Sequence, residues 1–204
     1  MRMKLIVATQ NKKKLQEIKD ILRGYSVEIF SLLDVTQTPR IIENGKTFQE
    51  NAIKKAVIIS RKVHGLVLGE DSGLCIDALD GRPGVYSARF AGSGKDDKKN
   101  NRKVLRLLRN LPLRKRAAGY VCAVALAERG RLVKVVQGEC RGRIAFEPRG
   151  SRGFGYDPLF LIPRYNKTFA QLGEGVKHTM SHRFRALKKA VCVIEKYIEQ
   201  QGRS

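Results

Sequence analysis

The sequence has 204 residues, of which 42% are hydrophobic, and it carries 41 Lys plus Arg against 19 Asp plus Glu, a net charge of +22. This length suits one large domain or two fused lobes, and the apolar content argues against wholesale disorder. The charge predicts attraction to nucleotides, nucleic acid and anionic lipid, although no zinc-finger spacing, ribonucleoprotein-type aromatic motif or Trp supports a dedicated nucleic-acid module.

The N-terminus and the cysteines indicate a soluble protein in a reducing compartment. The first apolar run, Leu5–Ala8, is too short for a signal-peptide core, and no stretch approaches the ~18–20 apolar residues of a membrane span. Four cysteines lie in apolar or strand-like settings without forming a Cys-x-x-Cys pair: Cys75, Cys122, Cys140 and Cys192. We therefore expect a cytoplasmic protein with reduced core thiols.

The first third of the chain predicts strands and helices in alternation. We expect strands at Lys4–Ala8 and Ser26–Leu33, with a helix between them that Asn11 caps and Gly24 ends. Residues 34–46 are polar and turn-rich. Thr47 then opens a long helix with one apolar face: Phe48, Ala52, Ala56, Ile59 and Val63.

The remaining elements complete an α/β pattern. Short strands are expected at Leu66–Gly69, Leu74–Ile76 and Val85–Phe90, and an amphipathic basic helix at Asp96–Leu111. Arg129-Gly130 separates Ala117–Glu128 from Leu132–Arg141, which predicts a long hairpin. Residues 147–157 are glycine-rich, and a final helix runs from about Ser181 to Gln200.

Residues 8–14, ATQNKKK, lie between the first strand and the first helix. Backbone amides and the helix dipole favour an anion at such a place, Asn11 offers amide hydrogen bonds, and three lysines supply charge. The glycine spacing of a Walker loop is absent. Two interpretations stay open here: a phosphate cradle of another kind, or an ordinary capped helix with exposed lysines.

Residues 69–73, GEDSG, place Glu70 and Asp71 side by side at the end of an apolar run. Adjacent carboxylates repel each other, so we expect a cation nearby. Carboxylates at a strand end suit Mg²⁺, with waters and substrate phosphates completing its shell, and one of them could activate water as a general base. The alternative is a turn in which Asp71 and Ser72 bond their own backbone.

Two later segments offer groups that bind nucleotides. In residues 152–160, two glycines allow close backbone approach, Phe154 and Tyr156 offer rings for stacking, and Asp157 can accept a hydrogen bond. In residues 177–189, Lys177 precedes a helix that Ser181 caps, followed by an exposed His182 and Arg183. An arginine at a helix start opposes the dipole, a cost that function would explain. The alternatives are a tight turn and a surface Ser-His-Arg.

Together and in this order, six motifs resemble those of the inosine triphosphate pyrophosphatase family, whose bacterial members are dITP/XTP pyrophosphatases. The motifs are Thr9-x-Asn11-x-x-Lys14, TFxENA from Thr47, EDSGL from Glu70, PGVYSAR from Pro83, FGYDP from Phe154 and SHR from Ser181. Each motif is modest alone, but the set is specific and covers nearly the whole chain.

The resemblance implies Mg²⁺-dependent hydrolysis of ITP, dITP and XTP between the α and β phosphates, which keeps these nucleotides out of DNA and RNA. It implies an α/β homodimer with an elongated mixed β-sheet flanked by helices and a central cleft between two lobes, and we expect a single domain over residues 1–204.

By position, the resemblance also assigns the site residues. Asp71 would bind metal and act as the water-activating base, and Ser72 would touch substrate. The triphosphate would be held by Thr9, Gln10, Asn11, Lys12, Lys13, Lys14 and Lys177. The base pocket would consist of Phe154, Gly155, Tyr156, Asp157, His182 and Arg183. Because Arg183 only donates hydrogen bonds, it would pair with a 6-keto oxygen and not with the 6-amino group of adenine.

One departure concerns the metal. The family usually has an acidic residue three positions before the glycine of the loop that precedes the long helix, and Ile42 stands there, followed by Glu43. Either Glu43 substitutes as a ligand or Glu70 and water complete the coordination. Ile42 and the charge of +22 also leave a second interpretation, a basic RNA-associated protein on the same fold with weakened catalysis.

Overall fold

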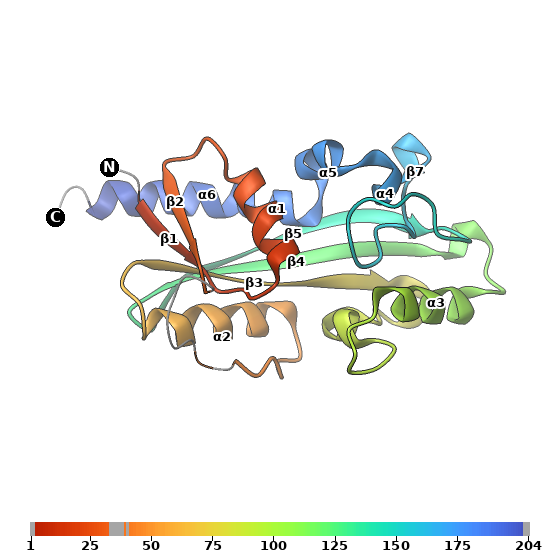
Figure 1. The fold of residues 1–204 in the computed structure, drawn as a ribbon, viewed down its shortest axis with the longest axis horizontal. Helices are drawn as coiled ribbons and strands as arrows, with labels where there is room; N and C mark the ends of the chain where they lie inside the picture. Colours follow the sequence, from red (N-terminus) through yellow and green to blue (C-terminus); the bar gives the residue numbers. More distant parts are fainter. Residues whose placement is uncertain (1–2, 33–38, 40, 202–204) are drawn as a thin grey trace. The chain divides into compact units, whose positions relative to one another are not determined.

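A seven-stranded sheet of order β2-β1-β3-β4-β5-β6-β7 organises the computed structural model, which describes residues 3–32, 39 and 41–201 (Figure 1). Strand β1 (Met3–Val7) runs parallel to both β2 (Val27–Ser31) and β3 (Leu66–Ile76). Strand β6 (Phe160–Ile162) runs antiparallel to β5 (Arg131–Ile144) and to β7 (Lys167–Thr168). The sheet is therefore mixed, as expected; β4 (Ala117–Glu128) lies between β3 and β5.

Helices and short 3-10 turns connect these strands. The α-helices are α1 (Lys12–Ile21), α2 (Phe48–Ser60), α3 (Asp97–Leu108), α4 (Phe169–Leu172), α5 (Glu174–Met180) and α6 (His182–Gln201). The 3-10 turns are η2 (Asp77–Leu79), η3 (Gly84–Arg89), η4 (Leu113–Lys115) and η5 (Pro163–Tyr165). Within the described ranges, each helix is too short or too polar to cross a membrane.

Contacts divide the chain into two compact units. Unit 1 comprises residues 1–71, 122–138 and 183–204, and unit 2 comprises residues 72–121 and 139–182. Strands β3, β4 and β5 each contribute residues to both units. The expectations of a single domain over residues 1–204 and of a central cleft stay predictions.

In unit 1, both faces of the sheet are covered. Alternate residues of β1, β3 and β4 pack with helices α1 and α6 in one core cluster, which includes Leu5, Leu68 and Val124. The residues between them, such as Ile6, Val67 and Ala123, are also buried. Helix α2 lies on the side of these strands opposite α1 and α6 (Figure 1). Because side chains of a strand alternate between its faces, each of these strands has buried side chains on both faces of the sheet.

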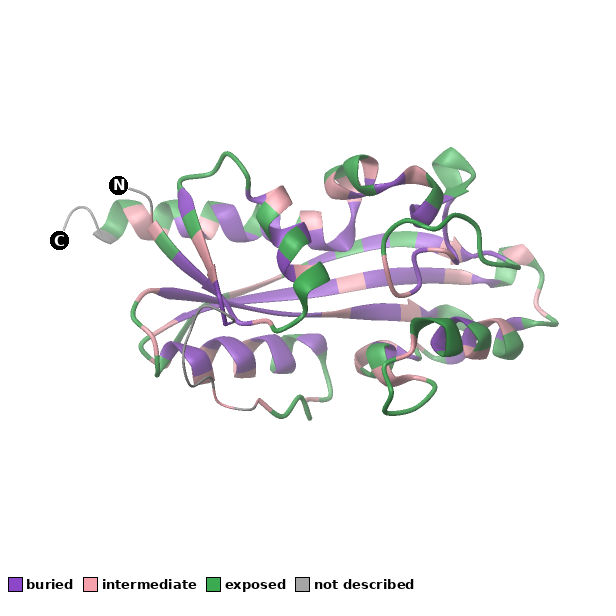
Figure 2. Cartoon of the chain, in the orientation of Figure 1, coloured by how far each residue is buried: buried purple, intermediate pink, exposed green. Residues whose placement is uncertain are grey.

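Unit 2 has a core of its own, built around aromatic rings. Tyr120 of β4 packs on Phe160 of β6 with ring centroids 4.6 Å apart, and Phe160 packs on Phe169 of α4 at 5.3 Å. Helix α3 adds Val104 and Leu108, both fully buried. Figure 2 shows β3 and β4 buried over most of their length.

Most of the expected elements are confirmed. Asn11 and Thr47 cap α1 and α2, and the hairpin of β4 and β5 turns at Arg129-Gly130, both with positive φ. Val63 lies beyond the end of α2. Of the expected second strand, Leu33 falls outside the described residues, as do residues 34–38 and 40 of the polar segment.

Two element predictions are wrong. The expected strands Leu66–Gly69 and Leu74–Ile76 are one continuous strand, β3, which lies between β1 and β4 in the sheet order. The expected strand Val85–Phe90 is the 3-10 helix η3, in which the Ser87 hydroxyl donates to the Gly84 carbonyl and accepts from the Leu74 amide. A serine that bonds locally in this way favours a turn over a strand.

The cysteines are all free, as expected, but their setting differs from the prediction. Cys122 and Cys140 are buried and Cys75 is partly buried, whereas Cys192 is exposed on α6. The interpretation of all four as core thiols is therefore wrong for Cys192, which faces away from the side of α6 that carries Leu187 and Val191.

Candidate functional site

The start of α1 is a capped helix with exposed lysines, and the interpretation as a phosphate cradle stays a prediction. The Asn11 Oδ1 atom accepts from the backbone amides of Lys13 at 3.0 Å and Lys14 at 3.2 Å, which makes it the helix cap. Gln10, Lys12 and Lys13 are exposed and Thr9 is partly buried. Lys14 turns inward: its side chain is 17% exposed and its Nζ atom lies 2.8 Å from Glu70 Oε2.

The adjacent carboxylates Glu70 and Asp71 point to opposite faces of β3. Residues 66, 68 and 70 share one face of a strand, and residues 67, 69 and 71 share the other. Glu70 accordingly meets residues of α1 and α6, and Asp71 meets residues of α2. The alternative of a turn at Asp71 and Ser72 is wrong. Because successive side chains of a strand point to opposite faces, the two negative charges are kept apart.

Glu70 is the centre of a buried cluster of two acids and two bases, hereafter the Glu70 cluster: Lys14, Glu17, Glu70 and Arg183. Arg183 Nη2 lies 3.0 Å from Glu70 Oε1, and Arg183 Nη1 also bonds Glu17. Glu70 and Arg183 are each 1% exposed. Burial alone would raise the pKa of Glu70, but Lys14 and Arg183 hold that pKa well below its usual range. Glu70 therefore stays ionised.

A thiol completes the surroundings of Glu70. Cys122 Sγ donates to Glu70 Oε1 at 3.3 Å. Burial and the neighbouring Glu70 charge raise the pKa of Cys122 well above its usual range. The group is thus a neutral thiol that donates a weak hydrogen bond, and its low reactivity follows from the same burial.

Asp71 is held by two side chains of α2. Asn51 Nδ2 donates to Asp71 Oδ2 at 3.0 Å, and Lys55 Nζ lies 3.5 Å from Asp71 Oδ1. Burial raises the pKa of Asp71, and the positive charges of Lys55 and Lys14 only partly offset this effect. A carboxylate with a raised pKa, fixed in orientation, is suited to accept a proton.

Helix α2 is fixed against β3 by the motif at its start. Asn51 Oδ1 accepts from the Gly45 amide at 2.8 Å, so both ends of its side-chain amide are used. A Cβ atom added at Gly69 would lie 2.7 Å from the backbone nitrogen of Ala56, and it would also collide with the carbonyl oxygen of Ala52. Glycine at this position lets the backbones of α2 and β3 meet, which brings Asn51 and Lys55 to Asp71.

The oxygen donors near Asp71 fit a hard divalent cation. Lys55 Nζ lies between Glu43 Oε2, at 3.0 Å, and Asp71 Oδ1, so a positive charge already bridges these two carboxylates. One or two carboxylates joined by substrate phosphates and water are what Mg²⁺ uses in proteins. Across the described part of the chain, no group of three or more His, Cys, Asp and Glu side chains forms a potential metal centre.

In unit 2, the FGYDP loop closes on itself through Asp157. Asp157 Oδ2 accepts from the Phe154 amide at 3.0 Å and lies 2.7 Å from Lys177 Nζ. The same Nζ atom lies 4.7 Å from the centre of the Phe154 ring. Tyr156 is 3% exposed, and its hydroxyl donates to the Ser87 carbonyl at 2.8 Å. Phe154 is thus the more accessible ring, while Lys177 and Asp157 form a buried pair.

Helix α3 binds the same loop through two hydrogen bonds to Gly155. The Gly155 amide donates to Asp97 Oδ2 at 2.8 Å, and Asn101 Nδ2 donates to the Gly155 carbonyl at 3.0 Å. Gly155 has a φ of 63°, which favours glycine. The backbone N–H and C=O groups of Gly155 are therefore both hydrogen-bonded to side chains of α3.

The expected exposure of His182 and Arg183 is wrong, because both residues are buried. His182 stacks on Tyr120 with ring centroids 4.6 Å apart and planes at 10°, and Arg183 binds Glu17 and Glu70. An arginine at the start of α6 is therefore compensated by two carboxylates. Ser72 is partly buried in β3.

Sequence reasoning missed several residues that position this site: Glu17, Lys55, Asp97, Asn101, Tyr120 and Cys122. Glu17 carried no local signal, because it lies about 200° around the helix from Leu15 and about 100° from Ile18. Lys55 carried a usable signal, because it lies three residues after Ala52 and four before Ile59, on the predicted apolar face of the helix.

Comparisons with known proteins agree over nearly the whole chain. A model of the Ham1 family matches residues 5–192. The dITP/XTP pyrophosphatase of Halalkalibacterium halodurans is 50% identical over 186 residues, 90% of this chain and 95% of that protein. The dITP/XTP pyrophosphatase of Shouchella clausii is 48% identical over 183 residues, 90% of this chain and 92% of that protein.

A solved structure agrees as well. A HAM1 protein from Coxiella burnetii has a TM-score of 0.86 and 36% identity, with coverage of 95% of this chain and 99% of that one. The resemblance inferred from the motifs is confirmed, and this chain belongs to the Ham1 family.

Proposed function

We propose that this protein is an Mg²⁺-dependent nucleoside triphosphate pyrophosphatase that converts ITP, dITP and XTP to the monophosphate and pyrophosphate. Relatives named dITP/XTP pyrophosphatase at 48% and 50% identity support the enzyme class and the substrates. Within the chain, the observation that carries the proposal is Asp71, a buried carboxylate with a raised pKa that Asn51 and Lys55 hold in place.

The triphosphate carries up to four negative charges, and unit 1 supplies groups that bind them. The start of α1 combines the helix dipole with the exposed Lys12 and Lys13. Lys14, partly screened by Glu70, adds a charge-assisted hydrogen bond to a phosphate oxygen. Thr9, Gln10 and Asn11 position the backbone of this segment.

Asp71 takes the proton of the attacking water. Asn51 fixes one of its oxygens, and the other, which lies 3.5 Å from Lys55 Nζ in this structure, would face the water and the metal. We assign Asp71 and Glu43 as the residues that would hold the metal, since Lys55 lies between their carboxylates in this structure. Glu70, the further ligand expected from the sequence, points to the opposite face of β3 and is paired with Lys14 and Arg183, so we do not assign it to the same ion. When bound, Mg²⁺ neutralises phosphate charge and stabilises the charge that develops in the transition state.

Unit 2 supplies the base-binding groups in this proposal except Arg183, which belongs to unit 1. Phe154 offers its ring, and Gly155 to Asp157 and His182 shape the surroundings. Lys177, which the resemblance assigns to the triphosphate, is a buried partner of Asp157 in this structure. Arg183 distinguishes purines by donating to a 6-keto oxygen, because facing the 6-amino group of adenine would leave donors unpaired at about 1–3 kcal/mol each. In this structure Arg183 is buried and bonds Glu17 and Glu70.

Product identity tests the proposal directly. Purified protein with Mg²⁺ is incubated with ITP, dITP, XTP, ATP and GTP, and phosphate is measured with and without an added inorganic pyrophosphatase. We expect phosphate only with the added enzyme, and strong preference for the first three substrates. Asp71→Asn should lower turnover by orders of magnitude, whereas Glu28→Gln, the same chemical change at an exposed position of β2, should not. Direct release of orthophosphate, or normal turnover of Asp71→Asn, would refute the mechanism.

The loop before α2 supports catalysis over the RNA-associated alternative. Ile42 is 64% exposed, while the neighbouring Glu43 reaches Lys55, so an acidic group is present beside Asp71 despite the departure at Ile42. We further propose a cytoplasmic homodimer. Light scattering behind a sizing column would test the dimer, with a mass near 46 kDa expected from the chain mass of 23.0 kDa.

A further inference from the structure

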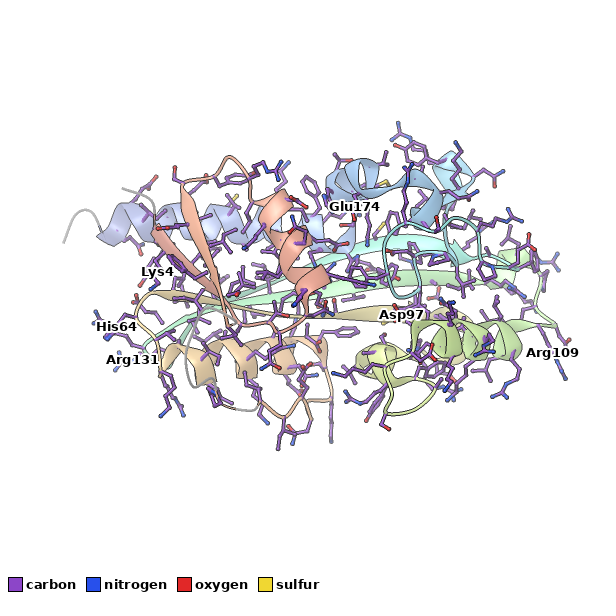
Figure 3. All side chains as sticks on the ribbon, in the orientation of Figure 1. Lys4, His64, Asp97, Arg109, Arg131 and Glu174 are labelled. Atoms are coloured by element: carbon purple, nitrogen blue, oxygen red, sulfur yellow. The ribbon has the colours of Figure 1, made fainter. Side chains whose placement is uncertain are left out.

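Helix α3 carries a row of exposed cations. Residues 95–116 contain ten basic and two acidic residues, so this short segment accounts for +8 of the net charge of +22. Lys98, Arg102, Arg106 and Arg109 are all exposed. With 3.6 residues per turn, these four lie within about a quarter of the helix circumference. We call them the α3 basic row; Figure 3 labels Asp97 and Arg109 at the two ends of this helix.

The opposite face of α3 is firmly attached to unit 2. Val104 and Leu108 enter the core, and Asn100 bonds the Ala91 amide at 2.7 Å and the Ala88 carbonyl at 3.2 Å. At the end of the helix, the buried Arg116 donates to the carbonyls of Leu108 at 2.8 Å and Leu111 at 2.9 Å. The basic row is therefore presented on a rigid support.

The charge of the row is little compensated locally, although Asp96 attracts Arg102 without forming an ion pair with it. In the described residues, none of its four members forms an ion pair. The two acidic residues of the segment lie at the helix start, where Asp96 caps the helix and Asp97 binds the Gly155 amide. Lys103 is not counted in the row, because its Nζ atom donates to the Phe90 carbonyl at 2.6 Å.

We propose that the α3 basic row binds the sugar-phosphate backbone of a nucleic acid duplex without reading its sequence. Lys98 and Arg109 are eleven residues apart, about 16 Å along a helix, and a duplex carries one negative charge per about 1.7 Å of its axis. The row offers no aromatic side chain on which a base could stack, so contacts are confined to the backbone.

The chemistry of α3 favours nucleic acid over a lipid surface. Leu107, its large exposed apolar side chain, lies between about 100° and 180° around the helix from the members of the row. Membrane-bound amphipathic helices instead bury a broad apolar face next to their cations, and the apolar face of α3 is used in the core. The row contains none of the residues assigned to hydrolysis, so this inference is independent of the proposed function.

The test compares two triple variants that remove equal charge. One is Lys98→Gln/Arg102→Gln/Arg106→Gln in the row. Its control is Lys62→Gln/Lys188→Gln/Lys196→Gln, three exposed lysines of unit 1. Binding to a fluorescein-labelled 20-base-pair DNA duplex is measured by anisotropy at several KCl concentrations, and hydrolysis of ITP and circular dichroism confirm that each variant is folded.

We expect the slope of log K against log salt to weaken by about 2.7 in the row variant, since each phosphate contact contributes about 0.9. Affinity at 0.1 M KCl should fall more than tenfold for the row variant and less than threefold for the control, with ITP hydrolysis unchanged in both. Equal losses in the two variants would assign the binding to diffuse charge and overturn the proposal. Binding to phosphatidylserine vesicles that depends on the row, without duplex binding, would overturn it in favour of a membrane.

Discussion

Glu70→Gln changes one buried charge and nothing of the side-chain shape. In the wild type, Glu70 is 1% exposed and shared by Lys14 at 2.8 Å and Arg183 at 3.0 Å. The substitution leaves two cations facing a single carboxylate, that of Glu17. Removing one partner of a buried pair costs about 3–5 kcal/mol of unfolding free energy. In a chain of this size that corresponds to a melting temperature lower by about 6–20 °C.

The pH dependence of this loss has a definite sign. Because the pKa of Glu70 is held below its unfolded value of about 4.5, its contribution to stability is fully present above that pH and is lost as the pH falls through the folded pKa. The difference in unfolding free energy between wild type and Glu70→Gln should therefore be largest near neutral pH and shrink below about pH 4.5.

Urea unfolding followed by far-UV circular dichroism is the suitable assay, since the chain has no Trp for fluorescence. Glu28→Gln, on the exposed side of β2, is the matched control and should change the unfolding free energy by less than about 0.5 kcal/mol. If Glu70→Gln were as stable as wild type at pH 7, the Glu70 cluster would not be a source of stability and the reasoning would fail.

Three further predictions concern activity. Lys14→Met should raise the KM for ITP at least tenfold, because it removes a charge-assisted bond of more than about 1.4 kcal/mol; an unchanged KM in initial-rate measurements would contradict phosphate binding by Lys14. The acid limb of kcat should lie above pH 3.8, because activity requires ionised Asp71 and its pKa is raised from that value; a pH–rate profile without such a limb would argue for another base. Asp97→Ala should raise the KM for ITP while kcat changes little, because the Gly155 amide loses its acceptor; equal KM values for Asp97→Ala and wild type would separate α3 from base binding.

Much of the site could be predicted because its motifs combine local signals. Asn11 and Thr47 are caps that sequence alone identifies, and both were found at helix starts. The sequence predicts that the pair Glu70-Asp71 is functional, but it does not predict the geometry of the pair, because a turn and a continuous strand are both compatible with EDSG. Counting alternation onward from Leu66 and Leu68 would have assigned Glu70 to their face.

Long-range partners could not be predicted from local patterns. Glu17 and Arg183 are 166 positions apart, and Cys122 and Glu70 are 52 positions apart. No periodicity within one segment links such residues. For the same reason Arg183 was expected at the surface: its neighbours in sequence give no sign of the two carboxylates that bury it.

The close approach of α2 to β3 at Gly69 means that a residue without any functional group governs the reaction. Even the smallest substitution, Gly69→Ala, would wedge the helix away from the strand, since the added methyl group would overlap the backbone at Ala52 and Ala56. Asn51 and Lys55 would move with the helix and release Asp71. Gly69→Ala keeps every charge and every polar atom of the chain, and it would still lose activity because of one added methyl group.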